Sequence, residues 1–133
     1  MWDHKSKYYY ITANIEVNQF YHVVMTFDKF ESELKLFVNG NYIGKSTIEG
    51  KPKRLVSNNL HIGMASFERN KPLHQFKGFI SECGVWDYPL KDTEITKVYN
   101  TGIYKDYYTT SDTPIGYWNF ESGYDNIIFD TSK

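Results

Sequence analysis

Apolar and polar positions alternate in short runs along the chain, and most of these runs predict β-strands. Residues 20–28 are mainly apolar and alternate only in part, which predicts a strand covered on both faces. Residues 34–38 alternate more regularly, and residues 42–46 resume the pattern after Asn39-Gly40. Both turn residues tolerate positive φ, so these two runs predict a hairpin with a tight turn at the glycine. A shorter aromatic strand is predicted at 8–11.

A later stretch predicts a strand, a turn and one short helix in succession. Residues 79–86 carry mostly apolar or small side chains on both faces of an extended chain, which predicts a strand inside a sandwich. Pro89 ends this strand because its fixed φ and missing N–H do not suit a ladder. Apolar residues at near-helical spacing then predict a helix near 91–100, and Gly102 stands where its C-cap is expected.

These runs follow one another in the order and spacing of a known domain type. Residues 76–99 resemble the second half of laminin-G-like domains of the concanavalin A-like class, where F-x-G-x-I-D-E-V leads through a turn into a short helix. Residues 20–44 and the L-x-I-G strand at 60–63 resemble the part that precedes it. The matching residues are Phe20, Tyr21, His22, Val23, Thr26, Phe27, Asp28, Leu34, Leu36, Phe37, Val38, Asn39, Gly40, Gly44, Leu60, Ile62, Gly63, Phe76, Gly78, Ile80, Glu82, Trp86, Leu90, Glu94, Ile95 and Tyr99. Two positions depart from the family pattern. Lys91 stands where the family has a helix-capping serine, so Asp92 is the expected N-cap residue. Ser81 stands where the family has an aspartate.

The resemblance implies an all-β fold: a concanavalin A-like jelly-roll sandwich of two antiparallel sheets, with one short helix near 91–100. Residues 1–102 would form the jelly-roll core without its usual opening strands, and residues 103–113 would form a linker. Gly40, Gly78, Trp86 and Trp118 would be structural residues of this framework. Because Trp86 and Trp118 occupy strand positions of the family, they are expected in the core rather than in a binding site.

The segment 114–133 carries a pattern, W-x-F-[DE]-x-G followed by D-x-S, that opens the domain in the family instead of closing it. Three interpretations follow. The segment can complete this chain's own sheet, as in a permuted fold, with a strand at 115–120. It can pair with the sheet of a neighbouring copy in an assembly. It can also open a second domain. The sequence leaves all three open.

Composition and charge narrow the classes of partner. The formal net charge is −1, which gives no electrostatic reason to expect nucleic acid or an anionic membrane as partner. No apolar stretch is long enough to span a bilayer, and no apolar leader follows Met1. Aromatic residues make up 18% of the chain, which favours sheet. The single cysteine, Cys83, has no partner for an internal disulfide and is expected to be buried and unreactive.

Catalysis is not predicted. A glycoside hydrolase of this fold needs two carboxyl groups facing one cleft, about 5–9.5 Å apart. Glu82 and Asp87 are the nearby pair on the predicted strand, and their odd spacing places them on opposite faces. No nucleophile elbow, P-loop or dinucleotide fingerprint occurs, so no cofactor is predicted, and the four histidines lack a zinc spacing. Calcium is allowed by the resemblance, with Asp28, Asp87 and Asp125 as candidate ligands.

Sugar binding would require exposed aromatic side chains that stack on pyranose rings. Tyr104, Tyr107, Tyr108 and Tyr124 lie in less regular segments and are the candidate ligand-binding residues. The sequence thus favours a non-catalytic module that binds a glycan or a protein at a surface, extracellular or on a virion. A structural or decorating subunit of a phage or large virus particle, in a homo- or hetero-oligomeric assembly, is the first alternative. A glycoside hydrolase is the second.

Overall fold

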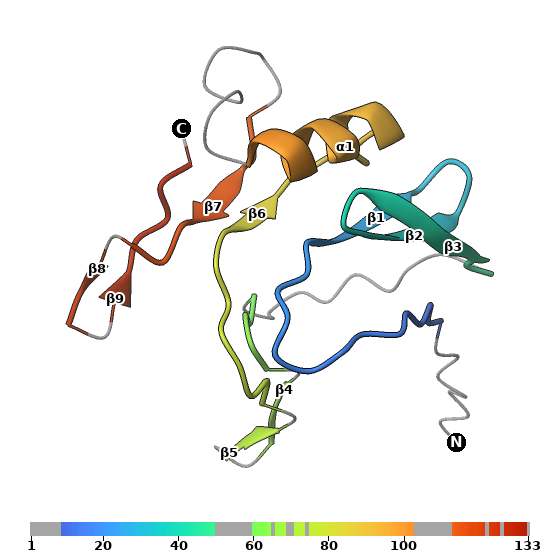
Figure 1. Cartoon of the computed structure of the whole chain (residues 1–133). Helices are drawn as coiled ribbons and strands as arrows, with labels where there is room; N and C mark the ends of the chain where they lie inside the picture. Colours follow the sequence, from blue (N-terminus) through green and yellow to red (C-terminus); the bar gives the residue numbers. More distant parts are fainter. Residues whose placement is uncertain are drawn as a thin grey trace.

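The computed structural model describes residues 9–49, 60–64, 66–68, 71–73, 75–102, 113–121, 123–125 and 127–132. These residues form short strands and one helix (Figure 1). In chain order they are β1 (Val23–Asp28), β2 (Glu33–Val38), β3 (Asn41–Thr47), β4 (Ser66–Glu68), β5 (Lys71–Leu73), β6 (Cys83–Val85), α1 (Asp92–Thr101), β7 (Gly116–Trp118), β8 (Gly123–Tyr124) and β9 (Ile127–Ile128). Every strand pairing among the described residues is antiparallel. The predicted all-β class with a single short helix is confirmed.

The largest sheet has the strand order β1-β2-β3, and its β2–β3 turn is the predicted hairpin. Asn39 and Gly40 both have positive φ, 51° and 74°, as a tight two-residue turn requires. The Asn39 side chain also fixes the start of β1, because its Oδ1 accepts a hydrogen bond from the His22 N–H at 2.9 Å, while the Asn39 N–H donates to the His22 carbonyl at 2.8 Å. The turn therefore ties all three strands together at one end.

The N-cap of α1 lies one residue earlier than predicted. Lys91 is the N-cap, and its N–H donates to the Glu94 carboxylate at 2.6 Å, which is half of a capping box. Asp92, expected at the N-cap, is instead the first helical residue, where its negative charge suits the helix dipole. The predicted C-cap is correct: Gly102 has φ 76° and its N–H donates to the Val98 carbonyl at 2.8 Å.

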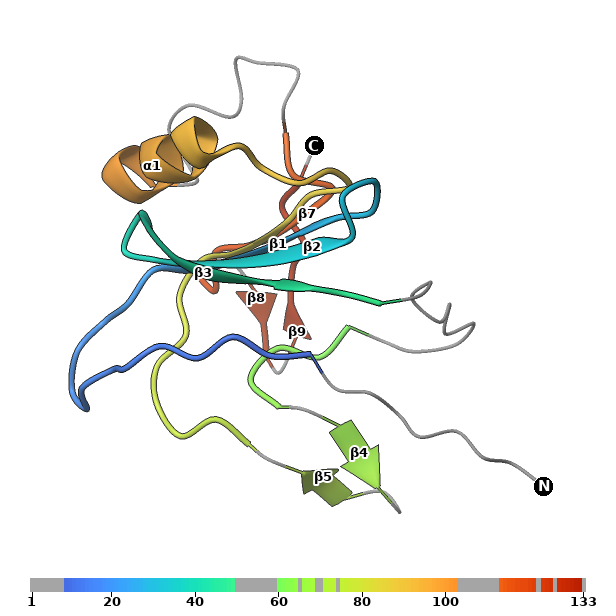
Figure 2. The ribbon, with the colours of Figure 1, turned by 90° about the vertical axis from the view of Figure 1, so that its right-hand side faces the viewer.

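The core lies where α1 meets the sheet and the β6–β7 pair. Figure 2 shows α1 on one side of the β1–β3 sheet, with the segments 9–22 and 75–82 on the other side. One buried cluster joins the sheet to the helix and the other joins the helix to β7; they consist of Phe37, Leu90 and Ile95, and of Val98 and Tyr117. Trp86 is half-buried and packs against both clusters.

Four predicted strands are shorter than expected or are not strands. The strand expected at 79–86 is reduced to β6, because Glu82 adopts a positive φ of 53° that interrupts an extended chain. Phe79, in the part of the expected strand that does not pair, is 86% exposed. Strand β1 starts at Val23 instead of residue 20, and Val23 and Met25 on its second face are 59% and 69% exposed, so β1 is not covered on both faces by the described residues. Neither residues 9–11 nor residues 60–63 form a strand, and Gly63 has a positive φ of 80°.

The segment after residue 113 pairs with a strand of the same chain. β7 runs antiparallel to β6, with Cys83 opposite Trp118 and Val85 opposite Gly116. Tyr117 is 2% exposed and is the residue of this segment that enters the core, whereas Trp118, which was expected in the core, is only half-buried, as is Phe120. The strand expected at 115–120 ends at Trp118, since Phe120 has a positive φ of 59°. The assignment of 114–133 to this domain, to a neighbour or to a second domain remains a proposal.

Candidate functional site

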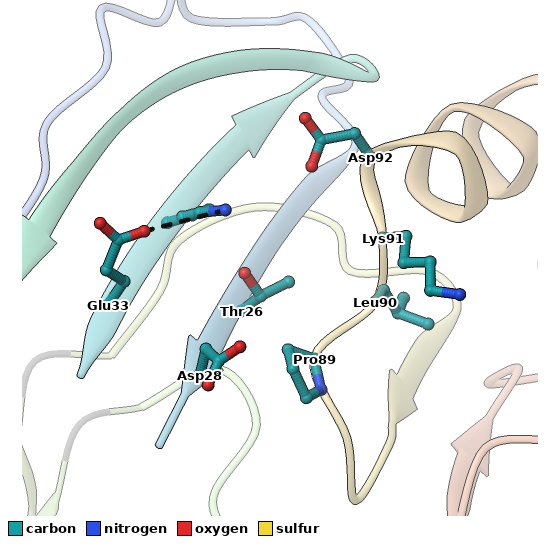
Figure 3. Close-up of a pocket in the computed structure, with 8 residues that line it drawn as sticks. Thr26, Asp28, Glu33, Pro89, Leu90, Lys91 and Asp92 are labelled. Atoms are coloured by element: carbon teal, nitrogen blue, oxygen red, sulfur yellow. Dashed lines mark ion pairs between the residues drawn. The ribbon is translucent and has the colours of Figure 1, made fainter. Parts of the chain in front are cut away.

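A pocket of about 220 Å³ lies between the β1–β2 face and the link that leads into α1 (Figure 3). The strands contribute Thr26, Asp28, Glu33 and Lys35, and the link and helix start contribute Pro89, Leu90, Lys91 and Asp92. Charged groups of both signs line it, together with an apolar edge. This is the combination that holds a small polar ligand by hydrogen bonds and contacts its apolar face.

The strand register builds one wall of the pocket. Thr26 and Asp28 are two residues apart on β1 and so share a face. Their partners across the ladder are Lys35 and Glu33, which bring two more polar side chains to the same face. The opposite wall is held by Leu90, which is 6% exposed and packs in the cluster with Phe37 and Ile95. A buried anchor directly next to Lys91 and Asp92 keeps the pocket rim at a fixed distance from β1.

The charged groups of the pocket are partly paired already. Glu33 forms an ion pair with Lys45, whose ammonium group also donates a hydrogen bond to the Glu33 carboxylate. A second ion pair joins Glu33 to Lys35, with 3.9 Å between the Lys35 Nζ and the carboxylate oxygen. The Asp28 Oδ1 accepts hydrogen bonds from the Phe30 N–H at 2.8 Å and the Glu31 N–H at 3.2 Å, which order the β1–β2 turn. Figure 3 shows the Asp92 carboxylate directed from the helix start toward the strands. The second oxygen of Asp28 and the carboxylate of Asp92 are thus placed to accept hydrogen bonds from a ligand.

The structure separates the residues that the sequence proposed for calcium. Asp28 ends β1, Asp87 lies in the bend after β6, and Asp125 lies in the turn between β8 and β9 with a positive φ of 58°. Within the described ranges, no three His, Cys, Asp or Glu side chains come together as a metal site. These three aspartates therefore do not form a shared calcium site in this arrangement.

The predicted ligand-binding tyrosines belong only in part to the described residues. Tyr124 is on β8 and is 79% exposed. Tyr104, Tyr107 and Tyr108 lie outside the described residues. Thr26 and Lys35 line the pocket but were not predicted as site residues. Each alternates with apolar neighbours along its strand, and this alternation is the signal that could have placed them on one polar face.

Two of the predicted structural residues, Gly40 and Gly78, lie close against aromatic rings. A Cβ on Gly78 would lie 2.8 Å from the Phe76 ring, and a Cβ on Gly40 would lie 2.9 Å from the Tyr99 ring. Trp118 is half-buried and its ring lies over Gly116, where a Cβ would come within 2.8 Å of it. These glycines therefore allow close approach of an aromatic ring to the backbone.

Comparison with known proteins establishes the family. The laminin G model described as "Concanavalin A-like lectin/glucanases superfamily" matches residues 1–96, which is well over half of the chain. The chain belongs to this superfamily, as the motifs predicted. No curated protein matches it.

A solved structure has the same fold. The 2.1 Å crystal structure of an S-layer domain-containing protein (residues 221–444) from Clostridium thermocellum ATCC 27405 superposes with a TM-score of 0.54 at 17% sequence identity. The match covers 66% of this chain and 42% of that structure, so this chain spans less than half the length of the solved relative. At this identity the likeness concerns the fold alone. In the part of the chain that the structure describes, no helix has the length and apolar character needed to cross a bilayer.

Proposed function

We propose that this chain is a non-catalytic binding module that attaches to a glycan on a surface. The observation that carries this proposal is the pocket between β1, β2 and the start of α1, where hydrogen-bond acceptors and donors stand beside the apolar Pro89 and Leu90. Sugar rings present hydroxyl groups at their edges and C–H groups on their faces, which such a lining complements. Membership of a superfamily that includes lectins supports the same proposal.

The surroundings of the pocket carboxylates favour binding over hydrolysis. A glycosidase needs one carboxylic acid held in its protonated form by apolar surroundings, beside a second carboxylate. Glu33 is instead ion-paired with Lys45, Asp28 is hydrogen-bonded to backbone N–H groups, and Asp92 is exposed. Glu82 and Asp87, the pair of carboxylates that the sequence placed on opposite strand faces, contribute nothing to this pocket.

A glycan array probed with the full chain tests the proposal, with Asp28→Asn as the informative variant. Asparagine keeps an Oδ1 that can accept from the Phe30 and Glu31 N–H groups, while it removes the charge of the oxygen left for a ligand. We expect Asp28→Asn to weaken glycan binding about tenfold with little change in melting temperature. Asp87→Asn is the matched control, an exposed aspartate outside the pocket, and it should bind like the parent. Absence of any array signal, or equal loss in both variants, would refute the proposal.

A second candidate function, a subunit of a surface or particle assembly, is favoured by a different observation. Phe20, Phe76 and Phe79 are 75%, 58% and 86% exposed, and they belong to the segments on the side of the sheet opposite α1 (Figure 2). Large exposed aromatic side chains are common at protein interfaces.

The mass of the chain in solution tests this second candidate. A subunit should form oligomers that bury roughly 1,000 Å² or more, whereas a free glycan-binding module should be a monomer. Phe79→Ser should then shift the mass toward monomer. Phe30→Ser is the matched control, because Phe30 is 85% exposed in the β1–β2 turn. A parent chain that is monomeric at all accessible concentrations excludes a self-assembling subunit.

A further inference from the structure

We propose that two copies of this chain bind each other through the β8–β9 hairpin of one copy, which docks on the face of the β1–β3 sheet that the other copy turns away from α1. This inference rests on the second candidate function, a subunit of an assembly, and adds to it the partner and the two surfaces that meet. It does not depend on glycan binding.

One face of the β1–β2 ladder is entirely apolar. Val24, Thr26 and Asp28 of β1 point toward α1 and the pocket, so the residues that alternate with them point the other way. Their partners across the ladder share that second face. We call it the outer face; it consists of Val23, Met25, Phe27, Leu34, Leu36 and Val38. A sheet face without polar side chains is normally buried against a second layer.

The described chain covers only part of the outer face. At Gly44 on β3, a Cβ would lie 3.5 Å from Ile11, so the chain that precedes β1 covers that side of the sheet. The outer-face residues of β2 are half-buried, whereas Val23 and Met25 of β1 are 59% and 69% exposed. Among the described residues, β1 pairs with β2 alone, so the uncovered apolar strip lies along an open sheet edge. Such an edge is a surface on which another chain docks.

The β8–β9 hairpin offers apolar side chains to such a surface. Tyr124 and Ile127 are directly opposite each other and so share a face, and they are 79% and 57% exposed. Ile128 and Phe129 are 43% and 49% exposed, and we call β8, β9 and Phe129 the arm. Among the described elements, β8 and β9 pack mainly on each other. A two-stranded hairpin by itself is marginally stable in water, so the arm gains stability when it is covered.

The arm is held away from the outer face of its own chain. Its base is tied to β7, because the Thr131 N–H donates to the Tyr117 carbonyl at 2.7 Å and the Ser132 hydroxyl donates to the Ile115 carbonyl at 3.3 Å. Figure 1 shows the arm and the β1–β3 sheet on opposite sides of the β6–β7 pair. A second copy can present its arm to the outer face without breaking these bonds. A base that is already fixed also lowers the entropy lost on docking.

Charge and area both suit contact between two copies. The formal net charge is −1, so two copies repel each other only weakly. The outer face is uncharged, and Asp125, in the turn that joins β8 and β9, is exposed and can stay in water. Covering the four apolar side chains of the arm would remove on the order of 400 Å² from water, given 150–250 Å² for a buried aromatic side chain. Two reciprocal contacts, each hiding a similar area of arm and face, total roughly 1,600 Å², the size of a stable interface.

The mass of the full chain in solution, measured by sedimentation equilibrium, tests this inference. We expect the parent chain to be dimeric at about 100 μM. Met25→Lys on the outer face and Ile127→Glu on the arm should each weaken dimerisation at least about a hundredfold, because each would bury an unpaired charge at the contact. Both side chains are more than half exposed in the single chain, so the fold should tolerate either change. Phe30→Glu is the matched control, an 85%-exposed position in the β1–β2 turn outside both surfaces, and it should dimerise like the parent.

An equimolar mixture of Met25→Lys and Ile127→Glu chains separates arm exchange from other modes of association. In the mixture, the unchanged arm of the Met25→Lys copy meets the unchanged outer face of the Ile127→Glu copy, and the two new charges are opposite in sign. Heterodimers should therefore form at concentrations where each variant alone is monomeric. A contact between two identical surfaces would not be restored by mixing, because it requires the same residues from both copies.

Each other outcome overturns the inference in a distinguishable way. A parent dimer that either variant fails to weaken would overturn arm exchange and leave the subunit function in place, because the copies would then meet elsewhere. Absence of heterodimers from the mixture, with both variants melting like the parent monomer, would do the same. A parent chain that is monomeric at all accessible concentrations would overturn both arm exchange and self-assembly.

Discussion

A Cβ added at Gly40 would be disfavoured both by the backbone conformation and by a steric clash. Its φ of 74° is in the left-handed region, which costs roughly 1–2 kcal/mol for other residues, and a Cβ would lie 2.9 Å from the Tyr99 ring on α1. We expect Gly40→Ala to lower the free energy of unfolding by about 2 kcal/mol, measured by urea denaturation. Gly44→Ala is the control, because a Cβ there would make an ordinary 3.5 Å contact with Ile11. Equal stability of the two variants would contradict the docking of the turn on the helix.

His22 gives the fold a dependence on pH. Burial lowers the pKa of His22 below its ordinary value of 6.5, and the Glu82 carboxylate opposes that change in part. Its Nδ1 has no hydrogen-bond partner among the described residues, and its ring lies 5.7 Å from the Tyr99 ring. Below pH 6.5 the unfolded chain therefore binds the proton first, so stability falls as the pH drops from 6.5 to the lower pKa of the folded state.

His22→Phe should remove that part of the pH dependence, measured as the free energy of unfolding between about pH 7 and pH 5. Phenylalanine retains a ring for the contact with Tyr99 and does not titrate. His61→Phe, outside the β1–β3 sheet, controls for the loss of a histidine as such. A parent slope that persists in His22→Phe would show that another group is responsible.

At the scale of elements, the last described residues hold β7 in place from the side opposite β6. The Asp130 Oδ1 accepts from the Tyr117 N–H and the Ser132 N–H, both at 2.9 Å, and the Thr131 N–H donates to the Tyr117 carbonyl at 2.7 Å. Hydrogen bonds from the Tyr117 and Ser132 N–H groups lower the pKa of Asp130. The stability that Asp130 provides is thus complete above its ordinary pKa, and it is lost as the pH falls through the lower folded-state value.

Asp130→Ala should lower the melting temperature by a few degrees at neutral pH and by less in acid, where the parent also loses the charged contact. Asp130→Asn, which retains an acceptor for both N–H groups, should lie between the parent and the alanine variant. A difference between parent and Asp130→Ala that does not change with pH would contradict the role of the charge.

The elements also show which features follow from sequence. The β2–β3 hairpin was predictable because Asn39-Gly40 prefers positive φ locally, and α1 was predictable from spacing and Gly102. The ends of β6 and β7 were not, because Glu82 and Phe120 adopt positive φ, which residues of these types seldom do. The residue types at these two positions give no local signature of a positive φ.

The candidate site was only partly predictable for a related reason. Asp28 was named from its residue type, but its pocket depends on the pairing of β1 with β2 and on the anchoring of Leu90. Neither depends on residues close to Asp28 in sequence. Thr26 was expected to belong to a strand, but nothing in its local sequence shows that it lines a pocket.

At the scale of the whole molecule, the reactivity of Cys83 can show whether the tail, residues 114–133, stays paired with β6. It lies in β6 opposite Trp118, it is half-buried instead of buried as expected, and burial raises its thiol pKa. We expect native Cys83 to react with a thiol reagent more slowly than the urea-unfolded chain, and faster after deletion of residues 114–133.

Tyr117→Ala provides a milder version of that deletion, because it removes the 2%-exposed side chain that β7 places in the core. It should also speed up the labelling of Cys83, while Tyr124→Ala, which alters a 79%-exposed side chain, should not. Unchanged labelling after the deletion would favour a tail that belongs to a neighbouring copy or to another domain.

Trp86 touches both buried clusters, one that holds the sheet to α1 and one that holds β7 to α1. A single indole shared by two small cores means that neither core can open without loosening the other. The amides of Ile95 and Val98, one from each cluster, should therefore exchange with solvent deuterium in the same opening event and show the same protection. In Trp86→Ala the two protection values should separate, so that the hairpin side and the tail side of the molecule exchange as independent units.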